Sequence, residues 1–75
     1  MHNNIIMHDI AVNDYVKIGI YELGGVEKLW FKVMFIDNDG TFIGRCSNTP
    51  ICVMSIEQNQ CKAFNISDIL AIYND

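Results

Sequence analysis

One stretch, residues 29–46, constrains the fold of this chain more than any other, because two apolar runs in it flank four polar residues. In the first run every second side chain is large and apolar: Leu29, Phe31, Val33 and Phe35. An extended strand places such residues on one face, whereas a helix would scatter them around its circumference. Residues 37–40 (DNDG) favour a tight turn, and residues 41–43 resume β-favouring chemistry. The pattern predicts a β-hairpin whose first strand turns these four side chains toward the interior.

Shorter strands are predicted on both sides of this hairpin. In residues 15–21 the apolar Val16, Ile18 and Ile20 alternate with outward positions, and Gly19 between them predicts a bulge or a bend. The Gly-Gly pair in residues 22–27 predicts an exposed loop. The remaining predicted strands are residues 51–56, 61–66 and 71–73, with a proline turn at residues 47–50 and one helical turn at residues 67–70.

The order of these elements predicts the fold class. Five or six short antiparallel strands with one helical turn near the C-terminus are typical of an all-β fold, a small SH3-like barrel. An OB-like barrel is the alternative, but it would carry a longer helix between its third and fourth strands. A chain of 75 residues is expected to form a single domain, residues 1–75, in which residues 1–13 add an edge strand, a lid or a flexible arm.

Charge and cysteine content bear on partners and compartment. A net charge of −4 with five Lys and Arg residues argues against a nucleic-acid partner, although Lys17, Lys32 and Arg45 would form a small positive patch on one face of a curled sheet. The three cysteines leave one thiol unpaired, and no secretory leader is evident. No apolar run approaches the roughly 20 residues that cross a bilayer. A cytoplasmic protein without a membrane partner is expected.

Residue types that could bind a metal are present, but their spacing does not support a site. A calcium loop fails, because counting back from Gly40 places Phe35 and Cys46 at the ligand positions 1 and 12. His2, His8 and the cysteines show no C-x-x-C or H-x₃₋₅-H spacing, and neither histidine adjoins a nucleophile in a recognised context. We therefore expect no metal, no cofactor and no enzymatic activity. A third hypothesis is a ligand or metal sensor, which would require zinc held by the thiols.

Several short motifs resemble one known family. They are KLWFKV at residues 28–33, Gly40 and Gly44 on either side of Phe42, NTP at residues 48–50, and Phe64 followed by SDI at residues 67–69. Their order resembles that of the YegJ-like bacterial domains of unassigned function, over about Val16 to Ile72. The resemblance implies a small β-barrel-like module with no known catalytic residue. The chain departs from that pattern at residues 52–60, where EQNQ stands in place of a Gly-Asp turn.

The outward face of the central hairpin carries the functional prediction. If the odd-numbered residues of the first strand point inward, a tryptophan and two apolar side chains point outward, and two tyrosines of the preceding strand extend this patch. Aromatic and Met side chains are enriched at the anchors of protein interfaces. The predicted contact residues are Trp30, Met34, Ile36, Tyr15, Tyr21 and Lys32. Residues 5–12 or curling of the sheet could instead cover this face.

Two functional hypotheses follow from this face. The first is a non-enzymatic protein-binding module that acts by stoichiometric contact with a protein partner or a second copy, in the manner of an inhibitor, an immunity protein or a phage-encoded anti-host factor. Its predicted acidic rim consists of Glu22, Glu27, Asp37 and Asp39.

The alternative hypothesis is a barrel that binds RNA or single-stranded DNA. Aromatic side chains on a sheet can stack on bases while cations meet the phosphates. The predicted stacking residues are Tyr15, Trp30 and Phe42, and the predicted phosphate contacts are Lys17, Lys32 and Arg45. Binding that weakens steeply with salt would distinguish this hypothesis from the first.

Overall fold

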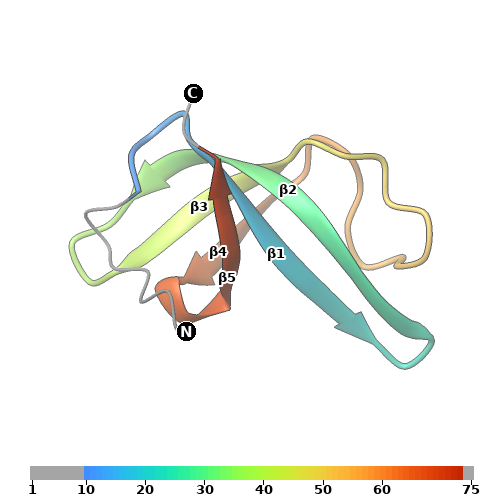
Figure 1. Ribbon diagram of the computed structural model, residues 1–75. Coiled ribbons are helices and arrows are strands. Elements are labelled where there is room, and N and C mark those ends of the chain that lie inside the picture. Colours follow the sequence, from blue (N-terminus) through green and yellow to red (C-terminus); the bar gives the residue numbers. More distant parts are fainter. Residues whose placement is uncertain (1–9, 74–75) are drawn as a thin grey trace.

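The computed structural model describes residues 10–73, which form one five-stranded antiparallel sheet. The strands are β1 (Tyr15–Glu22), β2 (Gly25–Ile36), β3 (Thr41–Cys46), β4 (Cys61–Asn65) and β5 (Ile69–Tyr73), and the 3₁₀ turn η2 (Ile66–Asp68) joins the last two. Their order across the sheet is β4-β3-β2-β1-β5, so the last strand returns beside the first (Figure 1). The predicted strand at residues 51–56 is absent from this order, for a reason given below.

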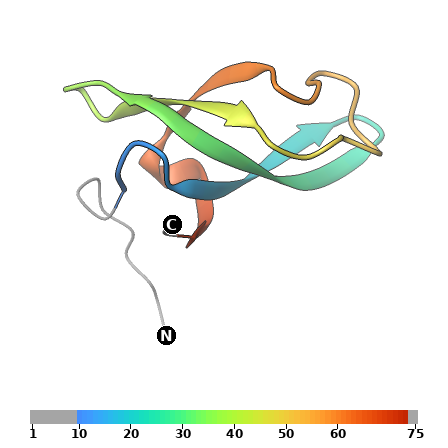
Figure 2. The same ribbon diagram turned by 90° about the horizontal axis from the view of Figure 1, so that it is seen from above.

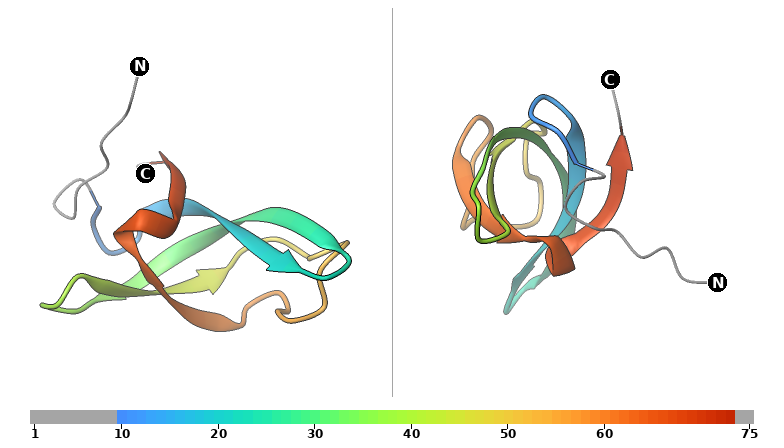
Figure 3. Two further views of the ribbon diagram at one scale, coloured as in Figure 1. Left: turned by 90° about the horizontal axis from the view of Figure 1, so that it is seen from below. Right: turned by 90° about the vertical axis from the view of Figure 1, so that its left-hand side faces the viewer.

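The sheet is rolled into the predicted small SH3-like barrel. Seen end-on, the strands enclose a round interior, and η2 carries the chain from β4 to β5 (Figure 3, right). The Asp68 carboxylate accepts a hydrogen bond from the Asn65 N–H at 3.0 Å, which caps this turn. No helix lies between β3 and β4 in the described chain, where residues 47–60 form an irregular segment instead. The all-β class is confirmed.

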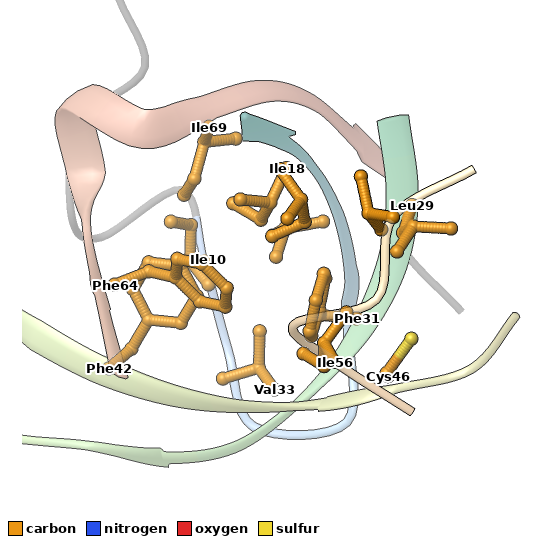
Figure 4. Packing of buried hydrophobic residues seen from close by; sticks show 13 residues of the cluster. Ile10, Ile18, Leu29, Phe31, Val33, Phe42, Cys46, Ile56, Phe64 and Ile69 are labelled. Atoms are coloured by element: carbon orange, nitrogen blue, oxygen red, sulfur yellow. The ribbon is translucent and has the colours of Figure 1, made fainter. Parts of the chain in front are cut away.

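The core fills the inside of this rolled sheet (Figure 4). As the alternation predicts, the inward residues of β1 and the first half of β2 are buried. Phe64 of β4 packs edge-on against Phe31 with ring centroids 4.8 Å apart. The core residues are Ile10, Val16, Ile18, Ile20, Leu29, Phe31, Val33, Phe42, Cys46, Val53, Ile56, Phe64 and Ile69. Of the predicted N-terminal segment, Ile10 lies in the core, and residues 1–9 lie outside the described chain.

The end of β2 departs from the predicted alternation. The β2–β3 register shifts between Val33 and Phe35, so Met34 is an extra residue in the ladder. Beyond that bulge the two faces exchange: Phe35 is 56% exposed, and Ile36 packs against the core. The prediction that Phe35 points inward and Ile36 outward is therefore wrong, because a bulge reverses the phase of a strand. Gly19 itself pairs regularly with Lys28, and the β1 irregularity lies one step earlier, between Lys17 and Ile18, opposite β5.

The predicted loop at residues 22–27 is shorter than expected. Glu22 pairs with Gly25, so the β1–β2 turn contains only Leu23 and Gly24, and the strands extend to its edges. Gly25 has φ +144°, a conformation that side-chain-bearing residues rarely adopt. The end of this longer hairpin lies next to the segment after β3 (Figure 2). The carboxylates of Glu22 and Glu27 accept hydrogen bonds from that segment.

These two carboxylates hold residues 51–55 through consecutive backbone N–H groups. Glu27 accepts from Ile51 at 2.9 and 3.0 Å, from Cys52 at 2.7 Å and from Val53 at 3.2 Å. Glu22 accepts from residues 54 and 55, at 3.0 Å and 2.6 Å. Amides that donate to side chains are not available for a strand ladder, so the prediction of a strand at residues 51–56 is wrong. We call this arrangement the carboxylate latch; within the latched segment, Val53 is buried in the core.

The latch lowers the pKa of both carboxyl groups from their ordinary value of 4.5. For Glu22 the main cause is the side-chain hydroxyl of Ser55, followed by the amides of Met54 and Ser55. For Glu27 the main causes are the amides of Cys52 and Ile51. In both cases the hydrogen bonds favour the ionised carboxylate, which explains why the pKa is lowered.

The latch predicts a pH-dependent stability. Because each folded-state pKa lies below 4.5, the carboxylates stabilise the fold above that pH, and this contribution is lost as pH falls through the folded-state values. We expect the double variant Glu22→Gln/Glu27→Gln to melt at a lower temperature than wild type near pH 7, with a difference that shrinks below pH 4.5. Thermal melts across this range test it, with Glu57→Gln as a control in the same segment. A pH-independent difference would contradict a role for the charges.

Tight packing at Gly44 yields a second prediction. A Cβ added there would lie 2.9 Å from Cβ of Phe31, closer than real side chains approach. Since both residues are buried in the sheet's inner face, Gly44→Ala should lower the free energy of unfolding by about 1–3 kcal/mol, which urea denaturation can measure. Gly24→Ala is the control: a Cβ there meets nothing within 4 Å. Equal stabilities for the two variants would show that the sheet relaxes around the added methyl group.

Candidate functional site

Three aromatic side chains frame an open hollow on the outer face of the sheet. Tyr15 of β1, Trp30 of β2 and Tyr73 of β5 line it together with Ser47, and its volume is about 430 Å³. Tyr15 and Trp30 are half-buried, whereas Tyr73 is 60% exposed. The exposed lining is apolar. We call this feature the aromatic hollow.

Strand register explains why these residues meet. Tyr15 lies opposite Tyr73 on β5 and opposite Lys32 on β2, while Lys17, the next outward residue of β1, lies opposite Trp30. Directly paired residues point to the same face, with strands about 4.8 Å apart. Residues distant in sequence are thereby brought side by side, because β5 lies beside β1 (Figures 1 and 3).

The backbone of Trp30 is held by the segment that leaves β3. Its N–H donates to Oδ1 of Asn48 at 2.6 Å, and its carbonyl accepts from the N–H of Ser47 at 2.8 Å. A side chain thus continues the ladder where the strand ends. On the other side, Nζ of Lys17 lies 5.1 Å from the centre of the indole ring, a cation–π distance. These contacts fix the indole as one wall of the aromatic hollow.

Positive charge surrounds the hollow. Lys32 pairs with Arg45 of β3, and Lys28 lies one outward position before Trp30. With Lys17, these residues account for four of the five Lys and Arg side chains in the chain. The acidic residues within the strands, Glu22 and Glu27, belong to the opposite face and are engaged in the carboxylate latch. The outer face is therefore locally basic on a chain of net charge −4.

The structure brings together half of the predicted contact residues. Tyr15, Trp30 and Lys32 are neighbours, as predicted. Met34 is exposed but sits at the bulge farther along β2, and Ile36 packs against the core, so Ile36 is a wrong prediction. Tyr21 is 75% exposed at the far end of β1, where it lines a second hollow of about 300 Å³ with Lys62 and Asp68, among others.

Phe42 and Tyr73 both differ from the prediction for the aromatic face. Phe42 is fully buried beside Phe64, so it is not available to stack on a base. Tyr73 lines the hollow but was missed, because only its pairing with Tyr15 places it there. The one signal in the sequence was that Tyr73 is an aromatic residue at an outward position of the last predicted strand.

The predicted acidic rim is not a rim of the aromatic hollow. Two of its carboxylates form the latch, and the other two stabilise the β2–β3 turn: Asp37 accepts from the N–H of Asn38 at 2.8 Å and Asp39 from that of Thr41 at 2.9 Å. The backbone bond and then the hydroxyl of Thr41 lower the pKa of Asp39. Both turn residues therefore serve local structure at one end of β2.

Residues 10–73 contain no group of side chains that could hold a metal ion, and two of their three cysteines are exposed. Within that range, no three His, Cys, Asp or Glu side chains gather closely enough to hold a metal ion, and His2 and His8 fall outside it. Cys46 is buried, which raises the pKa of its thiol, and it donates to the carbonyl of Asn48 at 3.3 Å; Cys52 and Cys61 are exposed. Among residues 10–73, no helix has the length and apolar composition needed to span a bilayer.

Comparisons with known proteins add no relative to this description. The resemblance of the short motifs to YegJ-like domains accordingly stays a prediction. No protein-family model, no curated protein and no solved structure matches the chain.

Proposed function

We propose that this protein is a non-enzymatic binding module that acts by stoichiometric contact through the aromatic hollow. The observation that carries the proposal is the meeting of Tyr15, Trp30 and Tyr73, from three strands, around an open apolar depression. The core is complete without these rings, so their exposed surface is not needed to fill it. Aromatic side chains partly embedded in a rigid surface are characteristic anchors of binding sites.

The charges around the hollow indicate the kind of partner. Lys17, Lys32 and Arg45 lie beside the aromatic rings, so a partner with anionic groups would gain from contact with this face. A two-fold dimer through the same face would place these cations of one copy against the same cations of the other copy. Like charges so placed repel each other, which disfavours such self-association. An anionic partner other than a second copy fits the face better.

Affinity capture from the cells that encode the protein tests the proposal. We expect immobilised wild type to retain a specific component that the double variant Trp30→Ala/Tyr73→Ser binds at least about 30-fold more weakly, since anchors of this kind contribute 2 kcal/mol or more. Leu23→Ser is the matched control, because Leu23 is fully exposed at the β1–β2 turn, away from the hollow.

Folding of each variant is checked by circular dichroism and thermal melts before binding is compared. Should Trp30→Ala unfold the barrel, Tyr73→Ser alone serves, since Tyr73 lies exposed in the last described strand. Retention of the same component by wild type and by a folded hollow variant with equal affinity would show that the contact lies elsewhere on the molecule.

A further inference from the structure

We infer that the occupant of the aromatic hollow is a single-stranded nucleic acid, an inference that rests on the binding function proposed above. Its basis is that aromatic and cationic side chains are neighbours on the outer face. The sequence-level objection, the net charge of −4, concerns the whole chain and not this face.

Two cross-strand rows define this arrangement. One row runs Tyr73, Tyr15, Lys32 and Arg45 across β5, β1, β2 and β3. The adjacent row runs Ala71, Lys17 and Trp30, and ends at Ser47 beyond β3. Neighbouring strands are about 4.8 Å apart, so each aromatic ring has a cation within one or two strand spacings. The face thus places planar aromatic rings next to positive charges, with Tyr15 paired with Lys32 and Trp30 with Lys17.

A single-stranded nucleic acid repeats the complementary pair in every unit, a planar base and an anionic phosphate. Bases stack on aromatic rings with little dependence on sequence, and cations beside the rings neutralise the backbone. An acidic peptide carries aromatic and anionic groups only where its sequence provides them. The three rings with cations beside them on the protein face therefore favour nucleic acid over an acidic peptide.

Screening explains how an acidic chain can present such a face. Exposed charges farther apart than the Debye length, about 8 Å at physiological ionic strength, interact weakly. Asp37 and Asp39 are hydrogen-bonded at the β2–β3 turn, and Glu22 and Glu27 lie on the opposite face at the other hairpin end. The phosphates of a bound strand would thus meet the nearby cations first. Double-stranded DNA, a broader cylinder with its bases stacked inside, could not use the rings.

Fluorescence titration tests the inference. We expect oligothymidine and oligouridine of about twelve residues to bind at low salt and to quench Trp30, the only tryptophan in the chain. With three or four phosphate contacts, log K should fall against log salt with a slope of about −2 to −3. Lys32→Gln should make that slope shallower by about 0.7. Lys62→Gln, which alters the one cation away from this face, should leave it unchanged.

Tyr73→Ala should weaken oligonucleotide binding about tenfold, because the loss of one stacking ring costs about that factor in affinity. The variant should stay folded, since Tyr73 is exposed. Binding to a glutamate-rich peptide containing tyrosine, with Trp30 quenched and no response to oligonucleotides, would overturn the inference and leave the proposed binding function standing. Absence of oligonucleotide binding at low salt would also overturn it, and the capture experiment would then decide the binding function separately. Equal loss of affinity in Lys32→Gln and Lys62→Gln would equally contradict it.

Discussion

The long strand β2 is the constraint on which the rest of the barrel depends. It pairs with β1 along one edge and with β3 along the other, so both hairpins share it. Its inward Leu29, Phe31 and Val33 form the middle of the core, and its outward Trp30 forms a wall of the aromatic hollow. Period-two alternation thus couples stability and binding in one strand, because a slip by one residue would exchange the two faces.

That alternation could be predicted because it is local. Side-chain direction in a strand depends only on neighbouring residues, so the inward faces of β1 and the first half of β2 follow from sequence order. The same rule failed at Met34, where the extra residue of a bulge reverses the phase. A bulge depends on how the partner strand is paired, and the printed order of residues around Phe35 contains no sign of it. The prediction for Phe35 and Ile36 failed for that reason alone.

Features that depend on distant residues were missed. The apolar residues at 51–56 resemble a strand, but Glu27 accepts from Ile51 and Glu22 from Ser55 across 24 and 33 positions of the chain. Tyr73 entered the site only through its pairing with Tyr15. The sequence predicted a shared face for Lys17, Lys32 and Arg45 only on condition that the sheet curls. The pairing of β1, β2 and β3 places the three side chains on one face. The sequence therefore predicted which kinds of side chain form the site, but which of them meet in space depends on the strand topology.

The carboxylate latch and the aromatic hollow are connected through the segment that begins after β3. Ser47 and Asn48, at its start, hold the backbone of Trp30, and residues 51–55, farther along it, are held by Glu22 and Glu27. The irregular segment between β3 and β4 is thus held twice by the β1–β2 hairpin, once through its backbone and once through its side chains. Its amides donate to these two carboxylates and keep them ionised near the β1–β2 end. The latch therefore holds both negative charges on the face opposite the hollow, which is why an acidic chain can offer an outer face suited to anions.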